Sequence, residues 1–190
     1  MELNPGGRML IMGPSGSGKT TMMRSLAGIW PFGEGVVELP PGDEALFLPQ
    51  KPYLPLGSLR EVLLYPHGDP TTSDALIRTA LDLAGMPALR GRLGESGLWS
   101  HTLSLGEQQR LAFARIFLQR PRWIFMDEAT SALDEPAEAV LYETLIRELP
   151  AAGIVSVGHR SSLIAFHESR LVLGGGGGWR IEEITEGLPA

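Results

Sequence analysis

The chain has 190 residues, of which 43% are apolar and 20% charged, and its formal net charge is −6. This composition is ordinary for a globular domain with its own core, and no basic cluster predicts nucleic-acid binding. No apolar run reaches the roughly 18 residues that span a bilayer, and no signal peptide opens the chain. Cysteine is absent, which excludes disulfides and thiolate metal sites. We therefore predict a soluble domain whose role at a membrane, if it has one, requires a partner or a fused segment.

Short apolar runs alternate with helical patterns in the first half of the chain. Arg8–Met12 predicts a buried strand, and Lys19–Ala27 predicts the helix that follows it. Further strands are expected at Val36–Leu39 and Ala45–Leu48, because glycine and proline bound both runs. The pattern is helical from Ser58 to Gly85, with one apolar face made by Leu76, Ile77, Ala80, Leu81 and Ala84.

The second half continues the alternation. A helix is expected from Ser104 to about Gln119, where Pro121 ends it, and Pro136 opens another that reaches about Leu149. Three more strands are expected at Trp123–Met126, Ile154–Val157 and, last in the chain, Leu171–Leu173. The glycine run 174–178 predicts a flexible turn. Alternating strands and helices predict an α/β fold with a largely parallel sheet flanked by helices.

The segment between the first strand and the first helix carries a phosphate-binding motif. Gly13-Pro14-Ser15-Gly16-Ser17-Gly18-Lys19-Thr20 fits G-x-x-x-x-G-K-[ST] in the required strand-to-helix context. The glycines let backbone N–H groups surround phosphate oxygens, and Lys19 adds a charge at the outer phosphates. The Thr20 hydroxyl is placed to ligate Mg²⁺, and Thr21 completes the predicted ATP site. The alternative interpretation is a glycine-rich turn without a ligand.

Two carboxylates, Asp127 and Glu128, directly follow the strand at Trp123–Met126. In an open α/β sheet, ligands bind beyond the carboxyl ends of the strands, where Gly13 is also expected. Asp127 would hold Mg²⁺ and Glu128 would polarise the attacking water, because only a bound cation makes adjacent carboxylates favourable near a triphosphate. Alternatively, acidic residues at strand ends can be simple caps.

With these motifs in place, the chain resembles the nucleotide-binding domain of an ABC (ATP-binding cassette) ATPase. Six motifs follow in the family's order: Walker A at 13–20, the Q-loop at Gln50, the signature at Leu103–Glu107, Walker B at Ile124–Asp127, the D-loop at Ser131–Asp134 and the switch histidine at His159. The resemblance implies a P-loop NTPase fold with a helical subdomain, about residues 55–120, inserted in a RecA-like core.

The resemblance also assigns roles to single residues. It makes Glu128 the general base and Lys19 a phosphate ligand, while His159 contacts the γ-phosphate and Gln50 senses Mg²⁺ and the transport partner. Asp134 belongs to the D-loop, although it could equally cap the following helix, and His159 could be a surface histidine. His67, His101 and His167 have no metal-ligand spacing and are expected to be solvated or packed.

The signature segment reads Leu103-Ser104-Leu105-Gly106-Glu107, where the family usually has LSGGQ. Ser104 and Glu107 have the spacing of a capping box, yet Gly106 in the first turn costs roughly 1 kcal/mol relative to alanine. A glycine there leaves a bare helix N-terminus, which suits an anion. In the resembled family, that helix end meets the γ-phosphate bound by a second copy of the domain, so Ser104, Leu105, Gly106 and Glu107 would serve ATP in trans.

Residues 48–58, 103–110 and 158–163 resemble one subgroup, which contains bacterial transporters with a fused N-terminal permease and the peroxisomal fatty-acyl transporters. This implies two partners, a second copy and a transmembrane permease fused N-terminally, at the cytoplasmic face of a membrane such as the bacterial inner membrane. The family stacks adenine on an aromatic residue upstream of the P-loop, an interaction worth about 1–3 kcal/mol. No aromatic residue precedes Gly13, so we expect a fragment that lacks the first strands.

Three other functions fit parts of the sequence. A soluble ABC ATPase of DNA repair or chromosome structure would need a coiled-coil arm, but Leu103 follows Gln50 by only 53 positions. A module that binds ATP without hydrolysing it would not need Glu128 and His159. A P-loop kinase would not need the signature segment. The leading hypothesis is an ATPase that powers transport, with ATP and Mg²⁺ as its ligands.

Overall fold

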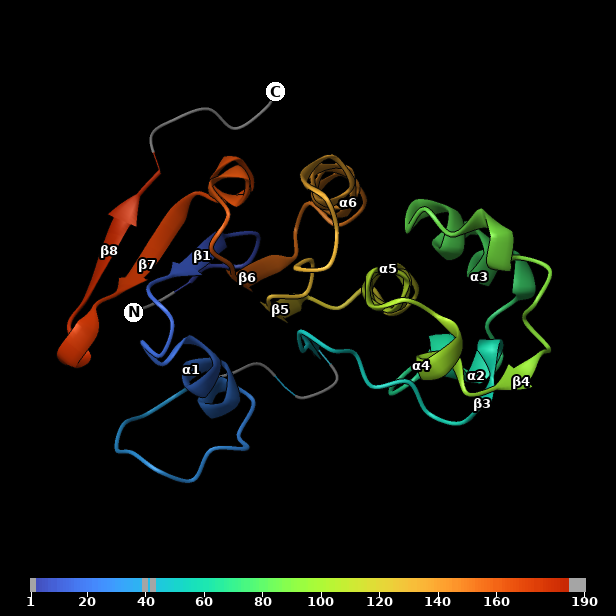
Figure 1. Ribbon diagram of the computed structural model, residues 1–190, viewed down its shortest axis with the longest axis horizontal. Helices are drawn as coiled ribbons and strands as arrows, with labels where there is room; N and C mark the ends of the chain where they lie inside the picture. Colours follow the sequence, from blue (N-terminus) through green and yellow to red (C-terminus); the bar gives the residue numbers. More distant parts are fainter. Residues whose placement is uncertain (1–2, 39–40, 42–43, 185–190) are drawn as a thin grey trace. The chain divides into compact units, whose positions relative to one another are not determined.

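The computed structural model describes residues 3–38, 41 and 44–184, and these form two compact units (Figure 1). The first unit contains the described residues up to Phe47, Arg122–Glu128 and the described residues from Ala151 onward. The second contains Leu48–Pro121 and Ala129–Pro150. The P-loop and Asp127 therefore belong to the first unit, and the signature helix belongs to the second.

A mostly parallel sheet organises the first unit. Its order is β2-β5-β6-β1-β7-β8, made by Ala45–Leu48, Trp123–Asp127, Gly153–Val157, Arg8–Met12, Ser169–Leu173 and Trp179–Glu183. β1 runs parallel to β6 and β7, and β5 runs parallel to β6. The α/β fold class and five of the predicted strands are confirmed. The carboxyl ends of β1, β5 and β6 consequently meet at one edge of the sheet.

The prediction that Leu171–Leu173 is the last strand is wrong, because β8 follows it antiparallel to β7. β8 lies at the end of the sheet order and its side chains are mostly exposed. It therefore carries little of the apolar signal that marks a buried strand. The glycine run forms the turn of this hairpin, with η3 at Gly175–Gly177 and a hydrogen bond from Gly174 N to Gly178 O of 2.7 Å.

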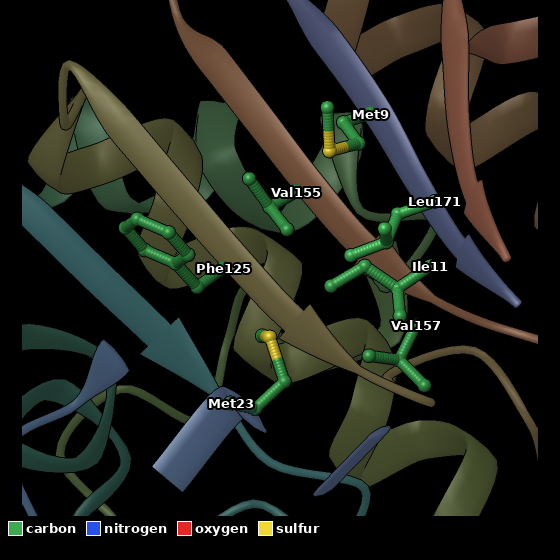
Figure 2. Packing of buried hydrophobic residues seen from close by; sticks show 7 residues of the cluster. All are labelled: Met9, Ile11, Met23, Phe125, Val155, Val157 and Leu171. Carbon is green, nitrogen blue, oxygen red and sulfur yellow. The ribbon is translucent and has the colours of Figure 1, made fainter. Parts of the chain in front are cut away.

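A buried cluster joins this sheet to α1 (Lys19–Leu26). Figure 2 shows its members: Met9, Ile11, Met23, Phe125, Val155, Val157 and Leu171. Phe47 stacks on Phe125 with ring centroids 4.4 Å apart. The alternate residues of the same strands, such as Leu10 and Ile124, are also buried, as expected for the uninterrupted apolar runs of a parallel sheet. This packing holds α1 against the sheet through Met23.

His167 is buried beside this sheet, directly after the short 3-10 segment η2 (Ser161–Phe166). Its Nδ1 lies 2.7 Å from Leu163 O and its Nε2 lies 2.8 Å from Ser156 Oγ on β6. Burial, and to a smaller extent the charge of Arg8, lowers the pKa of His167 from 6.5 to about 4, although the hydrogen bond to Leu163 O opposes the shift. The histidine is therefore a neutral part of the core, which confirms its interpretation as a packed residue; His67 and His101 are exposed.

We expect the protein to lose stability as the pH falls from 6.5 toward 4. The unfolded chain takes up a proton on His167 near pH 6.5, whereas the folded chain resists until about pH 4. Between pH 7 and pH 5 this histidine alone should lower the free energy of unfolding by about 2 kcal/mol. Urea unfolding at both pH values measures the loss, and a His167→Asn variant should show a smaller one. An equal loss in that variant would contradict the assignment.

Helices dominate the second unit. In chain order it contains β3 (Gly57–Ser58), α2 (Leu59–Leu64), α3 (Asp74–Leu83), η1 (Pro87–Leu89), β4 (Ser96–Gly97), α4 (Trp99–Thr102), α5 (Leu105–Gln119) and α6 (Glu135–Glu148). The prediction of a helical pattern throughout 58–85 is wrong for its middle, where Pro66 and Pro70 separate α2 from α3. Of the predicted apolar face, all residues are buried except Leu76, which is 60% exposed.

The predicted strand at Val36–Leu39 is also wrong for residues 36–38, which form neither strand nor helix, while Leu39 lies outside the described residues. Val36 is 89% exposed and Val37 53%. A β-branched run becomes a strand only when another strand pairs with it, and nothing in the described sheet order does so here. In the part of the chain that the structure describes, no helix is long and apolar enough to cross a bilayer.

Candidate active site

The P-loop between β1 and α1 has a backbone that only glycine adopts easily. Gly13, Gly16 and Gly18 all have positive φ, at 151°, 78° and 96°. A Cβ on Gly13 would lie 2.5 Å from Leu173 O and 2.8 Å from Ser17 Oγ, whereas nothing lies within 4 Å of one on Gly16 or Gly18. Gly13 is thus required by the packing against β7, and the two later glycines leave room in front of the loop.

Lys19 is buried at the first position of α1, with 7% of its surface exposed. Its Nζ donates to the carbonyl oxygens of Gly13 and Pro14 at 2.8 and 2.9 Å. No side chain caps the N-terminus of α1, and no acidic residue lies in its first turn. The free N–H groups and the positive end of the helix dipole therefore combine with the ammonium group to attract an anion.

These groups surround a cleft of about 280 Å³. Its lining comes from the loop, from the start of α1 and from the segments after β5 and β6: Ser15, Gly16, Gly18, Lys19, Thr20, Thr21, Glu128 and His159. The structure thus brings the predicted phosphate-binding residues together with both residues predicted to act on water. Sequence positions more than a hundred residues apart meet here because parallel strands end at the same edge.

Thr20 and Asp127 approach each other at this edge, with 3.4 Å between Thr20 Oγ1 and Asp127 Oδ1. Burial raises the pKa of Asp127, and the hydrogen bond from Thr20 opposes that rise. A hydroxyl and a partly desolvated carboxylate are oxygen ligands that suit Mg²⁺. Among the described residues there is no group of three or more His, Asp or Glu that could hold a metal by itself, so a cation here would need oxygens from a phosphate as well.

Glu128 has an unusual backbone for a residue with a side chain, with φ at 51°. Its N–H donates to Val157 O at the end of β6, at 3.1 Å, and this bond holds the strained conformation. The side chain is directed so that its Oε1 lies 3.2 Å from His159 Nε2. Strain of this kind costs about 1–3 kcal/mol and is concentrated at functional sites. The strain here aims the Glu128 carboxylate into the cleft.

The signature helix α5 begins in the second unit with the predicted capping box. Ser104 Oγ accepts from Glu107 N at 3.3 Å, and Ser104 N donates to Glu107 Oε2 at 2.8 Å. Hydrogen bonds from Ser104 lower the pKa of Glu107. A Cβ on Gly106 would lie 3.2 Å from Ala132 O, so this glycine also permits close contact with the D-loop segment. This close contact explains why α5 has a glycine at position 106 despite the low helix propensity of glycine.

Gln50 and Asp134 lie in the second unit with this helix. Gln50 Nε2 lies 3.5 Å from Ser131 Oγ in the D-loop segment. Asp134 accepts from Ala137 N at 2.9 Å and caps α6. Gln109, which sequence reasoning did not single out, contacts both segments from α5. The sequence signal that could have indicated it is a glutamine just before the apolar run Leu111 to Ala114 of the same helix.

Comparison with known proteins identifies the group to which this site belongs. The family model described as ABC transporter matches residues 1–131. The chain belongs to the ABC transporter family. Its ABC domain is 46% identical over 190 residues to an uncharacterized ABC transporter ATP-binding protein of Synechocystis, covering 97% of this chain. It is 41% identical over 201 residues to a lysosomal cobalamin transporter of mouse, again covering 97% of this chain.

A solved structure agrees with these relatives. The ABC domain matches a bacterial Atm1-family ABC exporter with ATP bound at a TM-score of 0.79 and 29% identity, covering 91% of this chain. The resemblance to ABC nucleotide-binding domains is therefore confirmed, and the chain is an ATP-binding domain with ATPase activity. It spans 28% of the Synechocystis protein, 32% of the mouse transporter and 33% of the exporter chain.

Proposed function

We propose that this ABC domain hydrolyses ATP to drive a membrane permease and that it works as a head-to-tail dimer. The observation that carries the proposal is the single cleft where Lys19 and Thr20 face Glu128 and His159. Phosphate-binding groups and water-activating groups lie within one site, as transfer of a phosphoryl group to water requires.

Each side chain has a step that its position supports. Lys19 exchanges the carbonyls of Gly13 and Pro14 for outer phosphate oxygens, and the N-terminus of α1 binds the same charge. Glu128 accepts a proton from the attacking water, while His159 orients that water and the γ-phosphate. Mg²⁺ held by Thr20 and Asp127 would neutralise charge on the phosphates.

The second copy supplies the rest of the site. The N-terminus of α5 offers the backbone N–H groups of Leu105 and Gly106 to a phosphate. The hydroxyl of Ser104 and the N–H of Glu107 join them once the capping box opens. In the isolated domain the Ser104 hydroxyl donates a hydrogen bond to the Glu107 carboxylate. It turns to the γ-phosphate of the other copy when two copies close. The bacterial Atm1-family ABC exporter that the domain resembles has ATP bound, which supports ATP as the ligand.

A permease partner is supported by the length of the relatives, since the domain spans only about a third of each. We propose that the permease is fused N-terminally, that the domain works at the cytoplasmic face of a membrane, and that residues of about 55–120 form the helical subdomain facing it. Tyr53 and Leu56 are 62% and 74% exposed and offer an apolar contact. Buried Arg115 donates to Tyr53 O at 2.9 Å and holds this segment to α5.

Mixing two inactive variants tests the shared site. Lys19→Ala removes the phosphate ligand of one site, and Ser104→Arg blocks the phosphate contact offered to the other. A mixed dimer has one intact site of its two. Random pairing of equal amounts makes about half of the dimers mixed, so about a quarter of all sites at most can recover activity. We expect neither variant alone to hydrolyse ATP above about a hundredth of the parent rate, and we expect the mixture to regain a measurable fraction. No recovery, with mixed dimers demonstrated by cross-linking, would refute the shared site.

A further inference from the structure

The side chain of Gln109 is completely buried in the second turn of α5, with 0% of its surface exposed. Apolar residues of the same helix, including Leu111 and Phe113, are buried to the same degree. A buried amide costs about 1–3 kcal/mol when its hydrogen bonds are missing. A glutamine at such a position therefore has to be satisfied by particular partners.

Its partners come from two segments far from it in sequence. Gln109 Nε2 donates to the backbone oxygen of Gln50 at 2.8 Å and to Ser131 Oγ at 3.2 Å. Gln109 Oε1 accepts from the backbone N–H of Ala132 at 3.0 Å. One amide thus connects the Q-loop, the D-loop and the helix that starts at Ser104, using its donor and acceptor sides at once.

A second set of contacts makes this connection stiffer. Gly106, three residues before Gln109, lies against Ala132 O and Leu133. Gln50 Nε2 also reaches Ser131 Oγ, so Ser131 contacts both glutamines. The neighbouring Gln108 donates to Leu103 O at 2.8 Å and to Ser100 O at 2.9 Å, which fixes the residues that lead into the signature segment.

We propose that Gln109 is a positioning residue that makes the Q-loop, the D-loop and the signature end of α5 move as one body. The inference rests on the proposed function, in which Gln50 responds to the permease and the other two segments meet the second copy. A displacement at Gln50 is then carried through one buried amide to both groups that complete the ATP site of the partner.

Two replacements separate the hydrogen bonds that the Gln109 amide donates from the one that it accepts. In Gln109→Glu the carboxylate has no N–H for Gln50 O, so the bond to the Q-loop is lost. The D-loop contacts can persist, because the carboxylate still accepts from Ala132 N and can also accept from the Ser131 hydroxyl, which then acts as the donor. In Gln109→Leu all of these hydrogen bonds are lost, while the volume of the side chain stays similar. Phe113→Leu is the matched control, because Phe113 is equally buried on α5 and packs on Tyr142 without a polar bond. All three are expected to lower Tm.

The hydrogen-exchange rates of nearby backbone amides should show which hydrogen bonds of Gln109 each variant has lost. The amide of Ala132 should stay protected in Gln109→Glu and exchange at least about tenfold faster in Gln109→Leu. The amides of Lys51 and Tyr53 should exchange faster in both, and neither effect should occur in Phe113→Leu. For ATP hydrolysis, both Gln109 variants should lose at least about tenfold in kcat with KM changed less than about threefold, because the Lys19 site is intact.

The inference is overturned if Gln109→Glu keeps kcat within about twofold of the parent, or if Phe113→Leu loses as much kcat at an equal drop in Tm. It is also overturned if KM rises by more than about threefold together with the loss of kcat, since that result would point to damage of the fold. A parent protein that does not hydrolyse ATP would remove the proposed function, and the exchange at the amides of Lys51, Tyr53 and Ala132 would still decide for or against the role of Gln109.

Discussion

Replacing Glu128 with glutamine is expected to reduce kcat for ATP hydrolysis at least about a hundredfold, the usual effect of removing a general base. The amide has nearly the same shape but cannot take up the proton of the attacking water. ATP affinity should stay within about threefold of the parent, because Lys19 and the P-loop are unchanged. ATP should then hold two copies together, since it is bound but not consumed.

Three measurements check this expectation: phosphate release, nucleotide binding by titration, and the mass of the protein in solution with and without ATP. Glu135→Gln is a suitable control, because Glu135 is an exposed carboxylate at the start of α6 and should leave kcat unchanged. Hydrolysis at the parent rate in the Glu128 variant would mean that another group activates the water.

Gly13→Ala should have the largest effect on the P-loop itself. The new methyl group would lie 2.5 Å from Leu173 O, and the backbone has a φ of 151° that side chains rarely adopt. Overlap and strain together should cost roughly 3 kcal/mol or more. Because the loop can only escape by moving away from β7, ATP binding should be lost together with stability.

Gly28→Ala provides the comparison for this change. Gly28 follows α1 and has a φ of 70°, but nothing lies within 4 Å of the position of its Cβ. It should therefore cost only about 1–2 kcal/mol of backbone strain and leave ATP binding intact. Urea unfolding and ATP titration of both variants give the two numbers. Equal losses of stability would show that the contact with Leu173 does not matter.

The sequence predicted the fold well where local signals and burial agree. β1, β5 and β6 are short apolar runs, and α5 and α6 have clear start signals in Ser104 and in Asp134 with Pro136. The errors occur where distant partners decide. Val36 and Val37 have the residues of a strand but no neighbour in the described sheet, whereas β8 has weak residues and is a strand because β7 pairs with it.

The same distinction holds for the candidate site. Thr20, Asp127, Glu128 and His159 could be placed together in advance, because parallel strands bring their carboxyl ends to one edge. The left-handed backbone of Glu128 could not be predicted, since it depends on a hydrogen bond to Val157. Likewise, the partners of Gln109 lie 59 and 22 positions away, and no local pattern encodes them.

The pairing of β5 with β6 has a consequence for activity. Asp127 lies opposite Val157 at the last pair of this ladder, and the next bond joins Glu128 N to Val157 O. The backbone positions from which the Glu128 carboxylate and the His159 ring project are therefore set by the alignment of the strands. A shift of one residue in the pairing of these strands turns each side chain of the shifted strand to the opposite face of the sheet. A substitution in the core of the sheet that causes such a shift would abolish activity although every catalytic side chain is still present.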